Sequence, residues 1–157
     1  MAAVLSLIDS GGRGPSIDRW RAMKLTDIHN QEIEIRDSTH LESLLAETPE
    51  IDGYGAFMIY TVVGEPELWL HFNKDTAYPH YFPTSDGSHP GWQPESEDRP
   101  EHENLPETIQ FLQVGASMAD GIEMPRETTV SRSRAIAAAK EFLAHQQLPP
   151  SISWFEL

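Results

Sequence analysis

The sequence predicts an α+β fold: a single domain with a mostly antiparallel sheet and two main helices packed on one side. The chain has 157 residues, of which 39% are apolar, and this is enough for one hydrophobic core. In the middle of the chain, segments that suit strands follow one another through hairpin-length turns. Two other segments have helical spacing, one before this block and one near the C-terminus.

The domain is expected to span residues 23–157, after a flexible leader at 1–22. The leader contains Gly11-Gly12-Arg13-Gly14-Pro15 and shows no periodicity. Its apolar start lacks basic residues and is too short for a signal peptide, and no apolar run approaches the ~20 residues that span a bilayer. The chain has no cysteine, which excludes a disulfide scaffold, a thiolate zinc site and a cysteine nucleophile. We therefore expect a cytoplasmic protein without membrane contact.

The first elements are two strands and a helix. Residues 24–27 and 32–36 suit strands, the second because charged and β-branched residues alternate. Asp37 or Ser38 is placed to cap a helix that Pro49 stops. Its apolar positions lie on one face: Leu41, Leu44 and Leu45.

The next three strands are predicted at 56–63, 67–72 and 76–82. In the second of them, alternation sends Leu68, Leu70 and Phe72 to one face and Glu67, Trp69 and His71 to the other. Pro79 lies within the third and cannot donate to a ladder, so this strand is expected at an edge or with a bulge.

The C-terminal part is predicted to contain a strand at 108–114, short extended pieces at 122–125 and 128–130, and the clearest helix. Ser131 or Ser133 caps this helix, which runs to about His145. Pro149-Pro150 ends it, and residues 151–157 alternate enough for a final strand.

The negative charge is concentrated in the middle of the chain. The formal net charge is -14, and residues 37–125 carry 17 acidic residues against only Lys74 and Arg99. Within this part, residues 83–107 are predicted to form a long polar loop that can be partly disordered. This loop contains seven acids and one base, Arg99. Such a field repels phosphate backbones, which argues against direct nucleic-acid binding. It attracts a basic protein partner, although acidity also serves solubility alone.

Histidines and carboxylates give the sequence its only candidates for catalysis. His71 and His80 lie on neighbouring strands with Asp75 between them, so a small metal-dependent or acid–base enzyme is the alternative reading. However, the sequence contains no His-Glu-x-x-His, no Gly-x-Ser-x-Gly and no phosphate-binding glycine loop. We therefore expect no enzyme, no metal and no cofactor.

Aromatic residues beside the acidic loop favour a binding protein. A few buried aromatics supply most of the energy of a protein interface, and charges steer the encounter. A single aromatic of this kind is more often a core residue, and it is the group beside the acidic loop that favours binding. The predicted partner-binding residues are Trp69, His71, Tyr81, Trp92, Glu95, Glu97, Asp98, Glu101 and Glu103.

Several segments resemble immunity protein family 1 of bacterial polymorphic toxin systems. The most specific is the closing stretch, where the alanine-rich helix with Glu141-Phe142-Leu143 is followed by Pro149-Pro150 and a strand with Trp154. The hairpin at 64–68, the His80-Tyr81-Phe82 strand, Gly87–Trp92 and Phe111-Leu112 also fit. The resemblance covers roughly residues 54–157.

The resemblance implies an antidote that binds and neutralises a cognate toxin domain. Many toxins paired with such proteins are nucleases or base deaminases, whose basic clefts an acidic surface would fit. The expected mechanism is occlusion of that cleft. A general acidic adaptor that binds several basic proteins weakly is a further alternative.

Overall fold

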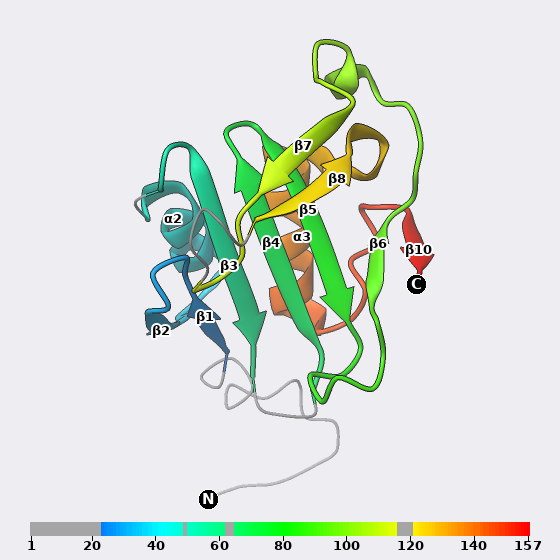
Figure 1. Cartoon of the computed structure of the whole chain (residues 1–157). Helices are drawn as coiled ribbons and strands as arrows, with labels where there is room; N and C mark the ends of the chain where they lie inside the picture. Colours follow the sequence, from blue (N-terminus) through cyan, green and yellow to red (C-terminus); the bar gives the residue numbers. More distant parts are fainter. Residues whose placement is uncertain (1–22, 49, 62–64, 116–120) are drawn as a thin grey trace, which may run out of the picture.

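A computed structural model of the chain describes residues 23–48, 50–61, 65–115 and 121–157, which form a sheet covered on both faces (Figure 1). The main sheet has the order β10-β6-β5-β4-β3-β1-β2, with β9 pairing β5, and all its pairings are antiparallel. Its strands are β1 (Lys24–Thr26), β2 (Glu32–Glu34), β3 (Tyr54–Tyr60), β4 (Glu67–Asn73), β5 (Thr76–Phe82), β6 (Trp92–Pro94), β9 (Val130–Ser131) and β10 (Trp154–Glu156). The α+β class predicted from the sequence is confirmed.

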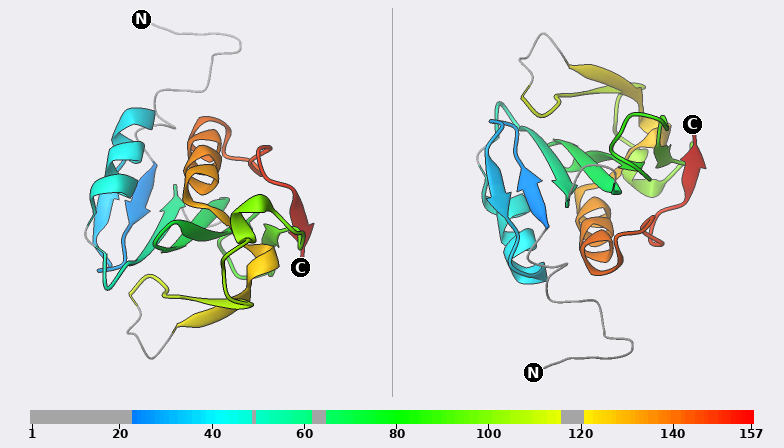
Figure 2. Two further views of the ribbon diagram at one scale, coloured as in Figure 1. Left: turned by 90° about the horizontal axis from the view of Figure 1, so that it is seen from above. Right: turned by 90° about the horizontal axis from the view of Figure 1, so that it is seen from below.

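Two helices, α2 (Ser38–Glu47) and α3 (Arg132–His145), pack on one face of this sheet (Figure 2). The predicted caps are present: the Asp37 carboxylate accepts a hydrogen bond from His40 N at 2.7 Å, and Ser131 Oγ accepts one from Arg134 N at 3.2 Å. The alternation predicted for β4 is also present. Leu68, Leu70 and Phe72 are fully buried in one core cluster with Phe142 of α3.

A hairpin of β7 (Thr108–Phe111) and β8 (Ile122–Pro125) lies on the opposite face of the sheet (Figures 1 and 2). Phe111 packs against Tyr78, with ring centroids 6.2 Å apart, and against His71 at 6.5 Å. As a result, His71 and Tyr78 are both 3% exposed, although the sequence placed His71 on the open side of its strand. The sheet is thus covered on both faces along this part of β4 and β5.

The prediction that the strand around Pro79 lies at an edge or carries a bulge is wrong: its register with β4 is continuous. β5 lies inside the sheet: β4 pairs with it along its whole length, and two shorter strands share its other side. Pro79 falls between the Ala77–Val130 pair with β9 and the Tyr81–Trp92 pair with β6. The missing N–H therefore meets a gap between two partners, which the sequence could not show.

The predicted polar loop at 83–107 contains regular structure. It includes β6 and the 3-10 helix η1 (Pro100–His102), and another 3-10 turn, η3 (Arg126–Thr128), precedes β9. Some predictions lie outside the described residues: the leader at 1–22, the stop at Pro49 and the end of the 56–63 strand. Neither α2 nor α3, the α-helices of the described part, is long and apolar enough to cross a bilayer.

Candidate binding surface

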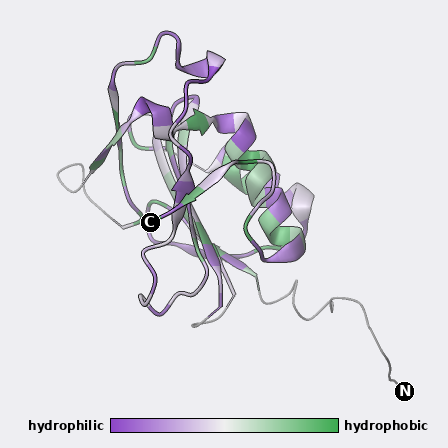
Figure 3. Cartoon of the chain, turned by 90° about the vertical axis from the view of Figure 1, so that its right-hand side faces the viewer, coloured by the Kyte–Doolittle hydropathy of each residue, from purple (hydrophilic) through white to green (hydrophobic). Residues whose placement is uncertain are grey.

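The stretch between β6 and β7, residues 95–107, concentrates exposed acidic side chains, and we call it the acidic segment. It leaves β6 at the side of the sheet, passes through η1 and enters β7 of the covering hairpin (Figure 1). Around η1 the ribbon is predominantly hydrophilic (Figure 3). Glu95, Glu97, Asp98 and Glu103 are exposed, and Glu101 is partly buried. The acidic loop predicted from the sequence therefore faces solvent.

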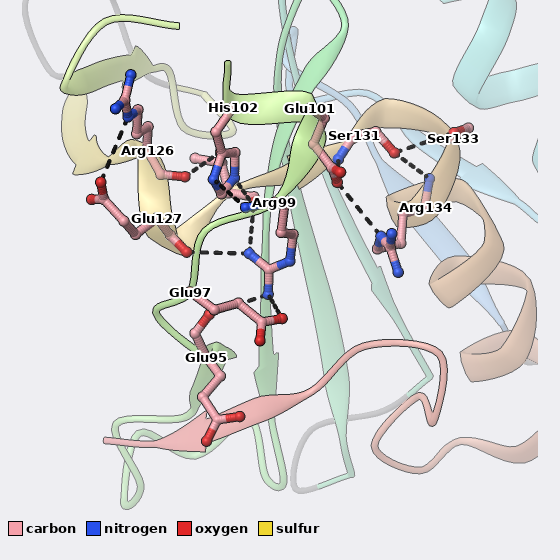
Figure 4. A network of polar contacts seen from close by, with 11 residues as sticks. Glu95, Glu97, Arg99, Glu101, His102, Arg126, Glu127, Ser131, Ser133 and Arg134 are labelled. Carbon is pink, nitrogen blue, oxygen red and sulfur yellow. Dashed lines mark hydrogen bonds and ion pairs between the residues drawn. The ribbon is translucent and has the colours of Figure 1, made fainter.

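Arg99 anchors the acidic segment to the body of the protein (Figure 4). Its side chain is only 7% exposed. The guanidinium donates to the carbonyl oxygens of Glu127 at 3.2 Å, Thr129 at 2.9 Å and Glu95 at 3.1 Å. Because a guanidinium has five donors in a rigid plane, one buried arginine holds two stretches of backbone together, the one at Glu95 and the one at 127–129.

His102 and Arg126 secure the far part of the segment (Figure 4). His102 is 2% exposed, and its Nε2–H donates to the Thr129 carbonyl at 2.9 Å while Nδ1 accepts from Arg99 N at 3.3 Å. Arg126 donates to the Leu105 carbonyl at 2.7 Å. The segment is therefore held at both ends of η1 by side chains that reach backbone carbonyls.

Two of the predicted binding carboxylates are used within the protein. Glu97 forms an ion pair with Arg99 at 2.9 Å. Glu101 accepts a hydrogen bond from Ser131 N at 3.2 Å and lies 3.6 Å from the Arg134 guanidinium, so it ties η1 to the start of α3. The carboxylates of Glu97 and Glu101 are therefore already bonded within the protein, and a cationic partner would have to compete with these bonds.

The other three predicted carboxylates, those of Glu95, Asp98 and Glu103, are exposed and form no ion pair with any residue that the structure describes. Since the backbone beneath them is anchored, they project from a fixed support. A cationic partner would meet charges that are already in place and would lose little conformational freedom in ordering them.

The predicted aromatic anchors do not form one cluster. Trp69 lies half-buried on the hairpin side of the sheet, next to His71, which is 3% exposed. Tyr81 is 7% exposed on the helix side, where it contacts Phe142, and its strand neighbour Trp92 packs against the same core. His71 and Tyr81 thus serve packing, and only Trp69 and Trp92 present side-chain surface to solvent.

His71 and His80 are each engaged with a backbone carbonyl in the described part of the chain. Burial lowers the pKa of His71 to about 4, so its ring is neutral at pH 7 and its Nδ1–H donates to the Tyr78 carbonyl at 2.9 Å. Burial also lowers the pKa of His80, whose Nε2–H donates to the Pro90 carbonyl at 2.9 Å. Neither ring contacts a carboxylate, and the described residues include no group of three or more metal-binding side chains.

Sequence reasoning missed Arg99, His102 and Arg126 as determinants of this surface. Arg99 could have been found from the sequence, because a single cation among the seven acids of 83–107 is a candidate for a structural ion pair or anchor. Its partners carried none, since they are backbone carbonyls far along the chain. Only the fold brings Glu127 and Thr129 to Arg99.

Fold and surface together define a small α+β protein that displays an anchored acidic segment beside a twisted antiparallel sheet. The chain belongs to the Imm1 immunity protein family: the family model described as Immunity protein Imm1 matches residues 16–156. This confirms the resemblance carried by the closing helix and strand, and the match extends well before residue 54. No curated protein matches the chain. Membership of this family implies a cognate toxin as the partner, and it indicates action by binding rather than by catalysis.

Proposed function

We propose that the protein neutralises a cognate toxin that acts on nucleic acid, a deaminase or a nuclease, by covering the toxin's basic active-site cleft with the acidic segment. The observation that carries the proposal is the set of exposed carboxylates at Glu95, Asp98 and Glu103, which have no ion-pair partner in the described part of the chain and stand on a backbone fixed by Arg99. Family membership supports the toxin as partner.

The chemistry of such toxins favours an acidic inhibitor. An enzyme that holds a phosphate backbone needs a cationic groove, and a surface of opposite sign competes for the same groups. Charge complementarity also speeds association, which benefits an antidote that has to bind before the toxin finds its substrate. Glu97 and Glu101 contribute mainly by holding the segment, because their charges are already paired.

A pair of charge reversals tests the proposal. Glu95→Lys with Glu103→Lys should raise the dissociation constant for the cognate toxin domain and flatten its salt dependence. The control is Glu42→Lys with Glu47→Lys on α2, which makes the same change in net charge at exposed positions away from the segment (Figure 1). Glu42 pairs with Lys140 at 3.5 Å, and because both side chains are exposed, losing this pair should cost less than about 1 kcal/mol of stability.

The expected result is a weakening of at least tenfold for the segment variant and less than threefold for the control. The wild-type protein should also block the toxin's nucleic-acid reaction at a ratio of about one to one. Equal affinity of the wild-type protein and the segment variant for the toxin would show that the interface does not include the acidic segment. Release of inhibition by the control alone would contradict the proposal as well.

A further inference from the structure

The hairpin side of the sheet is covered over only part of its area. β7 and β8 bury Ala56, His71 and Tyr78 at one end. Beyond them the same face continues through five side chains that are all partly exposed and belong to no buried cluster of the described residues. These residues, here called the aromatic shelf, are Met58, Tyr60, Trp69, His80 and Phe82.

The shelf is a connected surface because its residues come from neighbouring strands in register. Met58 on β3 faces Trp69 on β4, which faces His80 on β5. Phe82 stacks on His80 with ring centroids 4.2 Å apart and contacts Trp69 at 5.2 Å. Trp69 Nε1–H donates to Glu67 at 2.7 Å, which fixes the indole. The rings are therefore held in place before any partner arrives.

Carboxylates surround the shelf. The exposed Glu32 and Glu34 point to the same side from β2, and Tyr60 Oη donates to Glu32. Glu65 and Glu67 adjoin it at the start of β4. Among the residues that the structure describes, the base next to these carboxylates is Lys24, which is already paired with Glu32 at 3.6 Å. Aromatic faces bordered by an excess of carboxylates favour a cation.

Among protein cations, arginine suits this surface better than lysine. A guanidinium stacks flat on an aromatic ring while its N–H groups bind a carboxylate at the edge. The partly exposed indole of Trp69 offers the ring. Glu32 borders the shelf on the β2 side, and Glu67, 9% exposed, lies within it opposite Phe82. An ammonium group makes the charge contact without the planar stacking.

We propose that the aromatic shelf is a second contact surface for the toxin and receives an arginine side chain of the toxin over Trp69. This inference rests on the proposed function, since it takes the same partner. The acidic segment leads into β7 on the hairpin side of the sheet. Its η1 end and the shelf ends of β3 and β5 lie at opposite ends of the sheet, so the partner has to extend along the hairpin side to contact both (Figure 1). The segment supplies long-range attraction, and the shelf supplies a short-range contact.

Two shelf variants of the full chain, with a matched control, test this division by their affinity for the cognate toxin domain. Trp69→Leu removes the ring, and Met58→Lys places a positive charge on the shelf without removing any ring. The control, Phe155→Ala, removes an exposed aromatic on β10 that is 52% accessible and outside the shelf. Both shelf variants should raise the dissociation constant at least tenfold, and the control should leave it within twofold. For Trp69→Leu, the salt dependence should stay as in the wild-type protein.

A double-mutant cycle identifies the partner group. Each arginine of the toxin domain is changed to lysine and measured against wild-type and Trp69→Leu protein, and one arginine should lose most of its effect in the variant. Full affinity in folded Trp69→Leu and Met58→Lys proteins overturns the shelf while leaving the acidic segment intact. Weakening without coupling to any arginine overturns the arginine contact. If wild-type protein does not bind the toxin domain at all, the proposed function fails and the shelf fails with it.

Discussion

The two faces of the sheet are covered in different ways. On the helix side, α2 and α3 close one large apolar cluster that includes Phe72 and Phe142. On the hairpin side, the described residues form two clusters of three buried residues each, together with a buried histidine. The hairpin leaves the aromatic shelf partly exposed next to this small core. The helix side therefore carries most of the stability, and the hairpin side offers surface that is open to a partner.

This division matters for an antidote, because its recognition surface must change when the toxin changes. Substitutions on the open side cost little stability, since few apolar contacts depend on them. Substitutions on the helix side disturb packing that the whole sheet shares. Substitutions on the two sides should therefore differ in their effects on stability and on toxin binding.

The largest effect is expected from Phe142→Ala on α3. Phe142 is fully buried, and its ring lies 6.1 Å from that of Tyr81. Truncation leaves a cavity in the shared core and should lower the free energy of unfolding by about 3–5 kcal/mol. Chemical denaturation measures this, with Phe155→Ala as the exposed control, expected to stay within about 0.5 kcal/mol. A loss of less than about 1 kcal/mol would contradict a dominant helix-side core.

On the hairpin side, His71 should make stability depend on pH. Its folded pKa of about 4 lies below the ordinary value of 6.5, because burial disfavours the charged ring. Between pH 6.5 and 4 the unfolded chain takes up a proton that the folded chain does not, so stability falls as the pH falls. At pH 4 this proton uptake should lower the free energy of unfolding by an amount on the order of 3 kcal/mol relative to pH 7.

The comparison with His71→Gln isolates this effect, because glutamine can still donate to the Tyr78 carbonyl but does not titrate. Unfolding free energies measured at pH 7 and pH 4 should differ less in the variant than in the wild-type protein, while carboxylate effects cancel. A sharper form adds Phe111→Ala, which opens the cover and should bring the pKa of His71 back toward 6.5 in a proton NMR titration. Identical pH dependence of the wild-type and His71→Gln proteins would show that the hairpin does not desolvate the ring.

A smaller effect is expected from Arg99→Met, which releases the acidic segment. The change leaves the carbonyls of Glu95, Glu127 and Thr129 without their donor, and water replaces part of that loss. The expected cost is about 2 kcal/mol, with faster amide exchange at Glu97 and His102 while β3 and β4 stay protected. Arg134→Met, at an exposed pair with Glu101, should cost less than about 1 kcal/mol. Unchanged exchange in the segment would mean that Arg99 is not its anchor.

Local rules in the sequence accounted for most of the fold. Caps at Asp37 and Ser131, the alternation of β4 and the spacing of α3 all express short-range chemistry, and the structure has them where the sequence predicts them. The misjudged strand around Pro79 depended on two distant partners, β6 and β9, that share one side of β5. Which strands share an edge is a long-range property that local pattern does not contain.

The candidate site was less accessible to sequence reasoning, for the same reason. The sequence located the acidic residues, but it could not divide them into paired ones, such as Glu97, and unpaired ones, such as Glu95. It also placed Trp69 and Trp92 in one binding group, whereas they lie on opposite sides of the sheet. His71 looked accessible because the hairpin that covers it comes almost forty residues later in the chain.

The smallest expected effect separates paired from unpaired carboxylates within the acidic segment. Glu97→Gln breaks an ion pair to a buried guanidinium, and since Glu97 itself is 49% exposed, the loss of stability should be below about 1 kcal/mol. Glu95→Gln removes a charge without a partner among the described residues and should leave stability unchanged or slightly higher, because it relieves repulsion. For toxin binding the order should invert, with Glu95→Gln weakening the complex more than Glu97→Gln. Denaturation and titration of the same two proteins test both halves, and a variant that changed stability and affinity in parallel would show that the segment does not separate the two roles.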